Sequence, residues 1–304
     1  MNAGGRGHQP APLGWGAERQ LARLEGRRLL AQPLAWLSFI PFVLWARAID
    51  TLHNPEDVHF LLVGYGLVFP GFVLFALVVL GVLRCRSAGS DEILDVLPVG
   101  RDRRTVAHGL SALAAGLAGA LAVGAGYLAL RPEPLVGSMK DVLPVGIEVP
   151  RPGLAQLLQG PLALIVWCAL GVALARWLPS PLVVLALVVP AAAQFTLAGV
   201  WNGAPVSVVN WLLPLANGMV AGEWVGCGTD DVRCDLQLQG FDRVTPWWHL
   251  GYLVALVVVF VAVAVLRDRR DRTVWLTLAG AVAAAVAFGV VQGAVYQTYV
   301  PVAA

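Results

Sequence analysis

Residue types that carry out catalysis are sparse in this sequence. It contains no Walker A phosphate-binding loop, no HExxH zinc motif and no GxSxG nucleophile motif. The densest group of metal-ligand types is His53, Glu56, Asp57 and His59. These four residues could bind zinc weakly, but a solvated loop is the simpler interpretation. We therefore expect this chain to have no catalytic residue, cofactor or metal of its own.

Two cysteines form a second candidate site, either a disulfide or part of a metal site. Cys227 and Cys234 lie in residues 203–246, a long stretch between apolar segments. A disulfide between them would close a small ring, worth about 2.5 kcal/mol on the loop-entropy estimate. A zinc site would need two more ligands, and only His249 is near in the sequence. We predict a disulfide, with free thiols and a metal site as the alternatives.

Arginines near the N-terminus follow a helical spacing. Arg19, Arg23 and Arg27 recur every fourth residue, and Arg28 follows directly. The opposite side of such a helix carries Ala17, Leu21 and Leu24. The pattern predicts an amphipathic helix over residues 14–32 that lies in the membrane interface and faces anionic lipid or a cytoplasmic partner. A charge signal that only sets topology is the alternative interpretation.

The composition identifies the class of protein that must position these groups. Of 304 residues, 58% are hydrophobic and only 13% are charged, about half the charged share of a soluble domain. The apolar residues gather in runs of membrane-spanning length, which excludes soluble enzymes, nucleic-acid-binding proteins and disordered scaffolds. We predict an all-α polytopic helix bundle, with a cytoplasmic tail at 1–32 and a transmembrane domain at 33–304. The expected spans are seven: 33–49, 58–83, 106–130, 154–178, 181–201, 247–266 and 273–300.

The placement of basic residues orients this bundle. With a cytoplasmic N-terminus, most of the 21 Lys and Arg residues fall in inner segments, as the positive-inside rule requires. The exceptions are Arg47, Arg131, Lys140, Arg151, Arg233 and Arg243. We therefore expect a multi-pass protein of the bacterial plasma membrane with an outer C-terminus. The cysteine pair then lies on the oxidising side, where a disulfide persists.

The inner loop between the second and third expected spans is the most informative segment. Asp91 and Glu92 suit the first turn of a helix that Ser90 caps, and Pro98 ends it. The apolar face of this helix would consist of Ile93, Leu94 and Leu97. A helix of about two turns is marginal alone in water. It therefore needs a docking surface, either on its own bundle or on another protein.

These cytoplasmic elements resemble those of the permease subunit of ABC-2 type exporters. The acid–apolar–apolar–Pro–basic pattern of that family's coupling helix is matched by Glu92, Leu94, Leu97, Pro98 and Arg101. The arginine-rich helix is similar to the family's connecting helix. The resemblance implies that residues 91–101, including Asp91 and Ile93, contact a separate ATPase chain that binds ATP and Mg. It also implies a second permease, either another copy or a similar subunit.

The resemblance extends to residues 206–220, which are apolar but too short to span a membrane. Pro214 and Gly218 interrupt this stretch, as in the family's re-entrant outer segment. Two features depart from the family, which has six spans in its core pattern: the seventh span and the cysteine pair. A non-transporting membrane scaffold or assembly protein is the alternative function.

Polar groups at membrane depth are candidates for a substrate pathway. They are Gln159, Gln194 and Gln292. Such a group is a candidate site by default, although an amide can equally bridge two helices. The sequence has no chain of intramembrane carboxylates, which counts against proton-coupled transport. Small residues repeat every fourth position in the third and seventh spans, a pattern typical of close helix packing, and Pro70 is expected to kink the second span.

Overall fold

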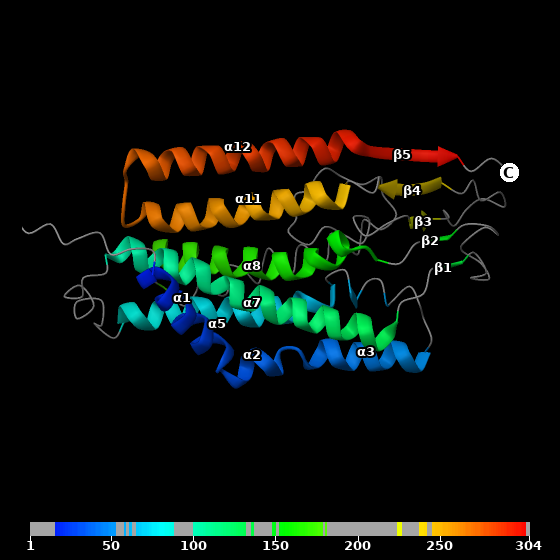
Figure 1. Ribbon diagram of the computed structural model, residues 1–304, viewed down its shortest axis with the longest axis horizontal. Coiled ribbons are helices and arrows are strands. Elements are labelled where there is room, and N and C mark those ends of the chain that lie inside the picture. Colours follow the sequence, from blue (N-terminus) through cyan, green and yellow to red (C-terminus); the bar gives the residue numbers. More distant parts are fainter. Residues whose placement is uncertain are drawn as a thin grey trace, which may run out of the picture.

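The computed structural model describes residues 16–52, 58, 61–62, 65–87, 100–131, 135–136, 148–149, 152–178, 180, 224–226, 237–241 and 245–301. Helices dominate this part of the chain and run roughly parallel along its long axis (Figure 1). Apolar segments adopt this form because a helix satisfies its backbone hydrogen bonds internally, without water. The helix bundle expected from the composition is confirmed.

Helix α8 (Leu154–Trp177) lies at the centre of the bundle. It packs against α7 (Arg101–Leu130), α5 (Val68–Ser87) and α11 (Thr245–Leu266). Helix α12 (Arg272–Val295) packs mainly on α11, at the edge of the bundle (Figure 1). The most apolar window of α8 is accordingly 61% buried, against 11% for α12. The exposed side of α12 is apolar enough to face lipid.

Small residues allow the helices to approach each other within this chain. A Cβ atom on Gly116 of α7 would lie only 2.5 Å from the side chain of Ile165 in α8, so a larger residue there would force the two helices apart. Ala285 of α12 belongs to a buried cluster with Tyr252 and Leu253 of α11. The small-residue repeats of α7 and α12 therefore serve packing between neighbouring helices of one subunit at these positions.

The N-terminal part of the chain consists of α1 (Gly16–Leu30), α2 (Pro33–Leu37) and α3 (Ile40–Leu52). The helical stretches 18–30 and 33–49 meet at an angle of 65°. Trp36 donates its indole N–H to the carbonyl oxygen of Leu30 at 2.6 Å, which satisfies one of the carbonyls left open at the end of α1. The bend falls at the boundary expected between the tail and the membrane domain.

Helix α5 begins later than the predicted second span. A short 3-10 turn, η1 (Tyr65–Leu67), precedes it, and Pro70 lies in the first turn of α5. Proline is tolerated there because the first N–H groups of a helix have no partner within the helix. Pro70 thus stands near the start of α5, just after the change from a 3-10 turn to an α-helix.

Short antiparallel strands lie at the end of the bundle remote from α1 (Figure 1). They are β1 (Leu135–Val136), β2 (Glu148–Val149), β3 (Trp224–Gly226), β4 (Gln237–Phe241) and β5 (Tyr296–Pro301). Strands β1 and β2 pair with each other, and β3, β4 and β5 form a second sheet. Helix α12 ends at Val295, before the expected end at 300, because the following Tyr, Thr and Val residues favour a strand.

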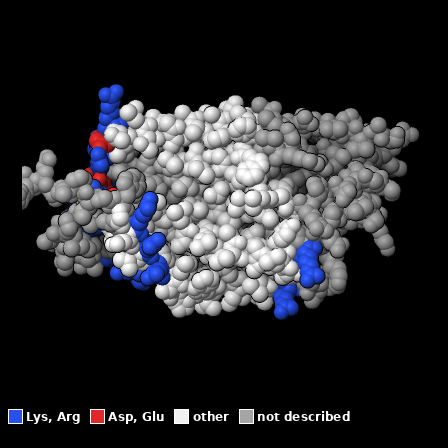
Figure 2. Space-filling model, in the orientation of Figure 1, with Lys and Arg blue, Asp and Glu red and all other residues white. Residues whose placement is uncertain are grey.

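Four helical stretches are long and apolar enough to cross a membrane: Arg101–Leu130, Leu154–Trp177, Trp247–Leu266 and Arg272–Gln292. The bent pair 18–30 and 33–49 would make a fifth if counted as one span, and Val68–Arg84 is a shorter apolar helix. The expected span at 181–201 lies outside the described residues. Among the described residues, the face in Figure 2 shows charged side chains at one end and a second group toward the other, with uncharged side chains between them. These features are those of a membrane protein, whereas seven spans are not confirmed.

Candidate functional site

Most of the predicted site residues lie outside the described part of the chain. They are Asp91, Glu92, Ile93, Leu94, Leu97, Pro98, Gln194, Cys227 and Cys234, together with His53, Glu56, Asp57, His59 and the segment 206–220. Arg101, the last residue of the predicted coupling segment, is described. It is the first residue of α7, and its side chain is exposed. The predicted coupling segment therefore leads directly into a long helix.

Polar and charged side chains gather around the start of α7, and we call this cluster the charged junction. It connects four parts of the chain: α1, α7, the end of α8, and the turn between α11 and α12. Its members are Glu18, Asp102, Arg103, Thr105, Arg176, Asp268 and Arg269.

Asp268 is the centre of the charged junction. Its Oδ2 atom lies 2.7 Å from the Thr105 hydroxyl and 3.9 Å from Nη1 of Arg176. The Thr105 hydroxyl is also 3.1 Å from the carbonyl oxygen of Arg101. Because the hydroxyl has one proton to donate, it donates to the closer acceptor, the Asp268 carboxylate. The side chains of Arg176 and Asp268 are only 9% and 11% exposed. Water therefore screens this pair poorly, and the pair holds α7, α8 and the α11–α12 turn together.

Two further ion pairs lie at the rim of the charged junction. Arg103 Nε is 3.5 Å from Glu18 Oε1, which links α7 to α1. Arg269 Nη1 is 3.5 Å from Asp102 Oδ2, which links the α11–α12 turn to α7. Arg269 is 55% exposed, and exposed pairs of this kind contribute little to stability.

The side chain of Trp177 links the end of α8 to α11. Its indole N–H donates to the carbonyl oxygen of Val263 at 2.9 Å. The guanidinium of Arg267 lies over the Trp177 ring, 5.6 Å from its centroid, which is within the range of a cation–π contact. The side chain of Trp177 thus adds a second link between α8 and the α11–α12 turn.

Asp271 begins α12 as its N-cap residue. Its Oδ1 atom accepts a hydrogen bond from the backbone N–H of Val274 at 3.0 Å, one of the N–H groups that a helix start leaves open. This hydrogen bond, with the nearby Arg269, holds the pKa of Asp271 below its ordinary value of 3.8. Asp271 therefore fixes where the turn ends and α12 begins.

The arginines of the predicted interfacial helix lie as expected on the exposed side of α1. Arg19, Arg23, Arg27 and Arg28 are all exposed. The buried side of α1 differs from the expected apolar stripe: Leu29 and Gly26 are buried, whereas Leu24 is 53% exposed. The reason is steric, because Gly26 brings α1 close to Ala114 of α7, with 3.1 Å between that side chain and a Cβ at Gly26.

Two of the predicted intramembrane amides are described, and both are buried. Gln159 lies in α8, and its Nε2 atom has no hydrogen-bond partner among the described residues. Gln292 of α12 pairs with His249 of α11, with 3.0 Å between Oε1 and Nδ1. Gln292 therefore bridges two helices, which was the structural alternative for this amide. Among the described residues, no three or more His, Cys, Asp or Glu residues are grouped as metal ligands.

The sequence pattern did not predict the contacts made by Thr105, Arg176, Asp268 and His249. One signal was available for Asp268, an acid among the arginines of the turn 267–272. No comparable signal marks Thr105 or His249, because their partners are distant in the sequence: Asp268 for Thr105, and Gln292 for His249.

Comparisons of the chain with protein-family models, with curated proteins and with solved structures gave no match. The functional interpretation therefore depends on this chain's own residues and geometry.

Proposed function

We propose that this chain is the permease subunit of an ATP-driven, ABC-2 type export system. Its helix bundle would form part of the membrane pathway, and a second copy or a similar subunit would complete it. A separate ATPase chain would bind ATP and Mg and would dock on residues 91–101. The N-terminus would lie in the cytoplasm of a bacterial cell, on the same side as the charged junction.

The charged junction is the observation that supports this proposal. Helix α7 starts at Arg101, where the segment resembling a coupling helix ends. Ion pairs and a hydrogen bond tie the first turns of α7 to α1, to α8 and to the α11–α12 turn. A displacement of residues 91–100 would therefore move several helices together. The α7 helix is about 45 Å long at 1.5 Å per residue, enough to carry that motion across the bilayer.

Gln159 supplies a candidate for contact with the transported molecule. It is buried in α8, the central helix of the bundle. A buried amide N–H without a partner costs free energy, and a transported molecule that accepts a hydrogen bond from Gln159 would recover part of that cost. A Gln159→Leu variant would then retain ATPase docking and change transport alone.

A positive charge introduced into the coupling segment tests the proposal. We would place Leu94→Arg in the full chain, reconstitute it in lipid nanodiscs with the ATPase that copurifies with the native chain, and measure bound ATPase and ATP hydrolysis. We expect at least a tenfold loss of bound ATPase, because the arginine would replace an apolar docking contact. Glu133→Arg, on the predicted outer side, is the matched control and should bind normally. Full binding by the Leu94→Arg variant would contradict the proposed docking.

A further inference from the structure

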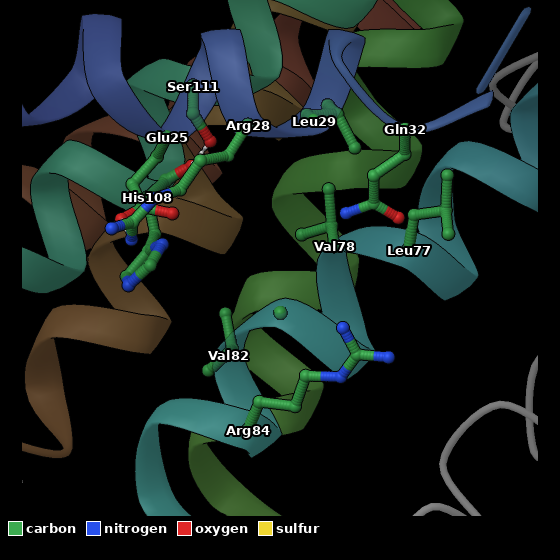
Figure 3. Close-up of a pocket in the computed structure, with 11 residues that line it drawn as sticks. Glu25, Arg28, Leu29, Gln32, Leu77, Val78, Val82, Arg84, His108 and Ser111 are labelled. Carbon is green, nitrogen blue, oxygen red and sulfur yellow. Dashed lines mark hydrogen bonds and ion pairs between the residues drawn. The ribbon is translucent and has the colours of Figure 1, made fainter. Parts of the chain in front are cut away.

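The two acidic residues of α1 lie on the side of this helix that faces the bundle. Glu18 pairs with Arg103 of α7 at 3.5 Å, in the charged first turn of that helix. Glu25 pairs with Arg28 at 2.8 Å, beside a cleft of about 230 Å³ between α1, α5 and α7 (Figure 3). Both carboxylates of α1 are therefore already engaged by an arginine.

Arg19, Arg23 and Arg27 lie on another side of α1, and we call these three residues the basic face. Residues four apart lie on the same side of an α-helix, and all three side chains are exposed. Among the described residues, no acidic side chain pairs with any of the three. The basic face thus presents three positive charges to the surroundings of the bundle.

The contacts between α1 and α7 indicate what surrounds the basic face. Glu18 lies beside Arg103, in the charged first turn of α7, whereas Gly26 lies against Ala114, in the apolar part of α7. Because charged residues are costly inside the hydrocarbon, the change from charged to apolar residues marks the level of the lipid headgroups. Helix α1 passes this level. Its side chains lean toward its N-terminus, so its arginines lean toward the charged end, as snorkelling arginines do.

Exposed apolar side chains accompany the basic face. Leu24 lies between two of its arginines and is exposed. Beyond the bend, Leu34 and Trp36 of α2 are exposed as well, and the indole hydrogen bond holds Trp36 next to the end of α1. A bilayer surface matches both features, because it offers phosphates to the arginines and acyl chains to the apolar side chains. The surface of an acidic soluble protein would match only the charges.

We propose that the basic face binds the headgroups of anionic phospholipids in the surrounding bilayer, with Leu24 among the upper parts of the acyl chains. Phosphate oxygens of these lipids accept hydrogen bonds from Arg19, Arg23 and Arg27. Because α1 packs on α7, this contact holds the start of α7 at a fixed depth in the membrane. The proposal is independent of the export function, since it requires neither an ATPase nor a transported molecule.

Hydrogen–deuterium exchange of the full chain in lipid nanodiscs tests this proposal. The backbone amides of residues 16–30 would be compared in phosphatidylcholine and in an equal mixture of phosphatidylcholine and phosphatidylglycerol. We expect exchange roughly 100-fold slower with phosphatidylglycerol, from about 1 kcal/mol for each of three basic residues. Equal exchange in the two nanodiscs would overturn the proposal and would favour an acidic protein as the partner of the basic face.

Phosphate and salt distinguish the lipid from other sources of negative charge. Millimolar inorganic phosphate, added to the phosphatidylcholine nanodiscs, should leave the exchange of residues 16–30 unchanged, because the contact requires phosphates held in a bilayer. High salt should remove most of the difference between the two nanodiscs, because it screens exposed charges. Slowing by phosphate alone, or a difference that high salt leaves intact, would contradict the assignment to lipid.

Charge variants locate the contact. Arg23→Gln with Arg27→Gln should reduce the slowing by phosphatidylglycerol to roughly fivefold, the contribution of one remaining arginine, and should leave the exchange in phosphatidylcholine within about twofold of the native rate. The matched control is Arg270→Gln with Arg272→Gln, which removes the same charge from exposed positions outside α1 and should keep the full slowing. Equal losses in the two double variants would refute this location.

An apolar variant tests the depth of α1 without a change of charge. Leu24→Ala should fold, because Leu24 is exposed and alanine favours a helix more than leucine does. We expect faster exchange of residues 16–30 in both nanodiscs, because the variant loses the contact of the leucine side chain with acyl chains. Unchanged or slower exchange would mean that Leu24 faces water, and would overturn the proposed position of the basic face.

Discussion

The charged junction and the His249–Gln292 pair hold helices together in different ways. The junction connects four parts of the chain through several ionic contacts near one end of the bundle. The His249–Gln292 pair is a side-chain contact between two helices, buried among apolar residues. The more exposed Arg269–Asp102 contact at the rim of the junction can exchange with water and rearrange, whereas a buried pair is either made or lost. The rim of the junction is thus a more suitable place for a moving connection than the His249–Gln292 pair.

The largest effect is expected at the centre of the charged junction. Asp268→Leu removes the carboxylate that pairs with Arg176. The Arg176 guanidinium, which is poorly exposed to water, then loses this partner. Breaking such a buried pair costs about 3 kcal/mol, measurable as a change in the free energy of unfolding in SDS. Asp268→Asn is the matched control, because its side-chain oxygen can still accept the hydrogen bond from Thr105. If Asp268→Leu were as stable as the native chain, the junction would not hold these helices together.

A smaller effect is expected for the buried His249–Gln292 pair. Gln292→Leu leaves His249 without its 3.0 Å partner, and the loss should be about 1 to 2 kcal/mol in the free energy of unfolding. The double variant His249→Leu with Gln292→Leu should be more stable than the sum of the single changes predicts. In each single variant one buried polar side chain loses its partner, whereas in the double variant both are replaced by apolar ones. Strict additivity in this double-mutant cycle would show that the two side chains do not interact.

The N-cap of α12 should give a pH-dependent effect. The pKa of Asp271 is lowered from 3.8 in the folded chain, so its ionised form stabilises the fold above that pH, and the benefit disappears as the pH falls through the lowered pKa. Asp271→Ala should therefore melt at a lower temperature than the native chain at pH 7, and the difference should shrink below the usual pKa. Asp271→Asn keeps a cap without a charge, and its difference from Asp271→Ala should not vary with pH.

The smallest effect is expected at the rim. Glu18→Gln removes the carboxylate that lies 3.5 Å from Arg103 Nε, and with side chains that are 14% and 31% exposed the loss should be about 1 kcal/mol or less. The effect should shrink in high salt, which screens partly exposed charges. A loss that persists at 1 M salt would mean that this pair is as shielded as the Asp268 centre, and the comparison between rim and centre would fail.

Sequence reasoning located the apolar helices well and their ends less well. The predicted span 154–178 matches α8, because Pro152 and Gly153 precede its apolar run. Helix α7 begins at Arg101 instead of the predicted 106, since a charged turn can be helical without being apolar. Hydropathy likewise did not separate Tyr296 and the residues after it from α12. The apolar pattern thus indicates which residues enter the membrane but not where hydrogen bonding stops.

The site was harder to predict than the bundle. The spacing of Arg19, Arg23 and Arg27 predicted their exposed side correctly, because residues four apart lie on the same side of an α-helix. The Thr105–Asp268 contact depends on how the α11–α12 hairpin is placed against α7, which the sequence pattern does not encode. The burial of Leu29 in place of Leu24 depends on the close approach at Gly26. The missed contacts are therefore those set by tertiary packing.

The most direct test of the proposed function is to identify what binds the native chain. A tagged full-length chain would be purified in mild detergent from its native host, and the copurifying proteins would be identified by mass spectrometry. The proposal predicts a roughly stoichiometric protein with a Walker A motif, which is lost when Leu94 is replaced by arginine. An intact complex that contains no ATPase would contradict the export proposal and would favour a membrane scaffold.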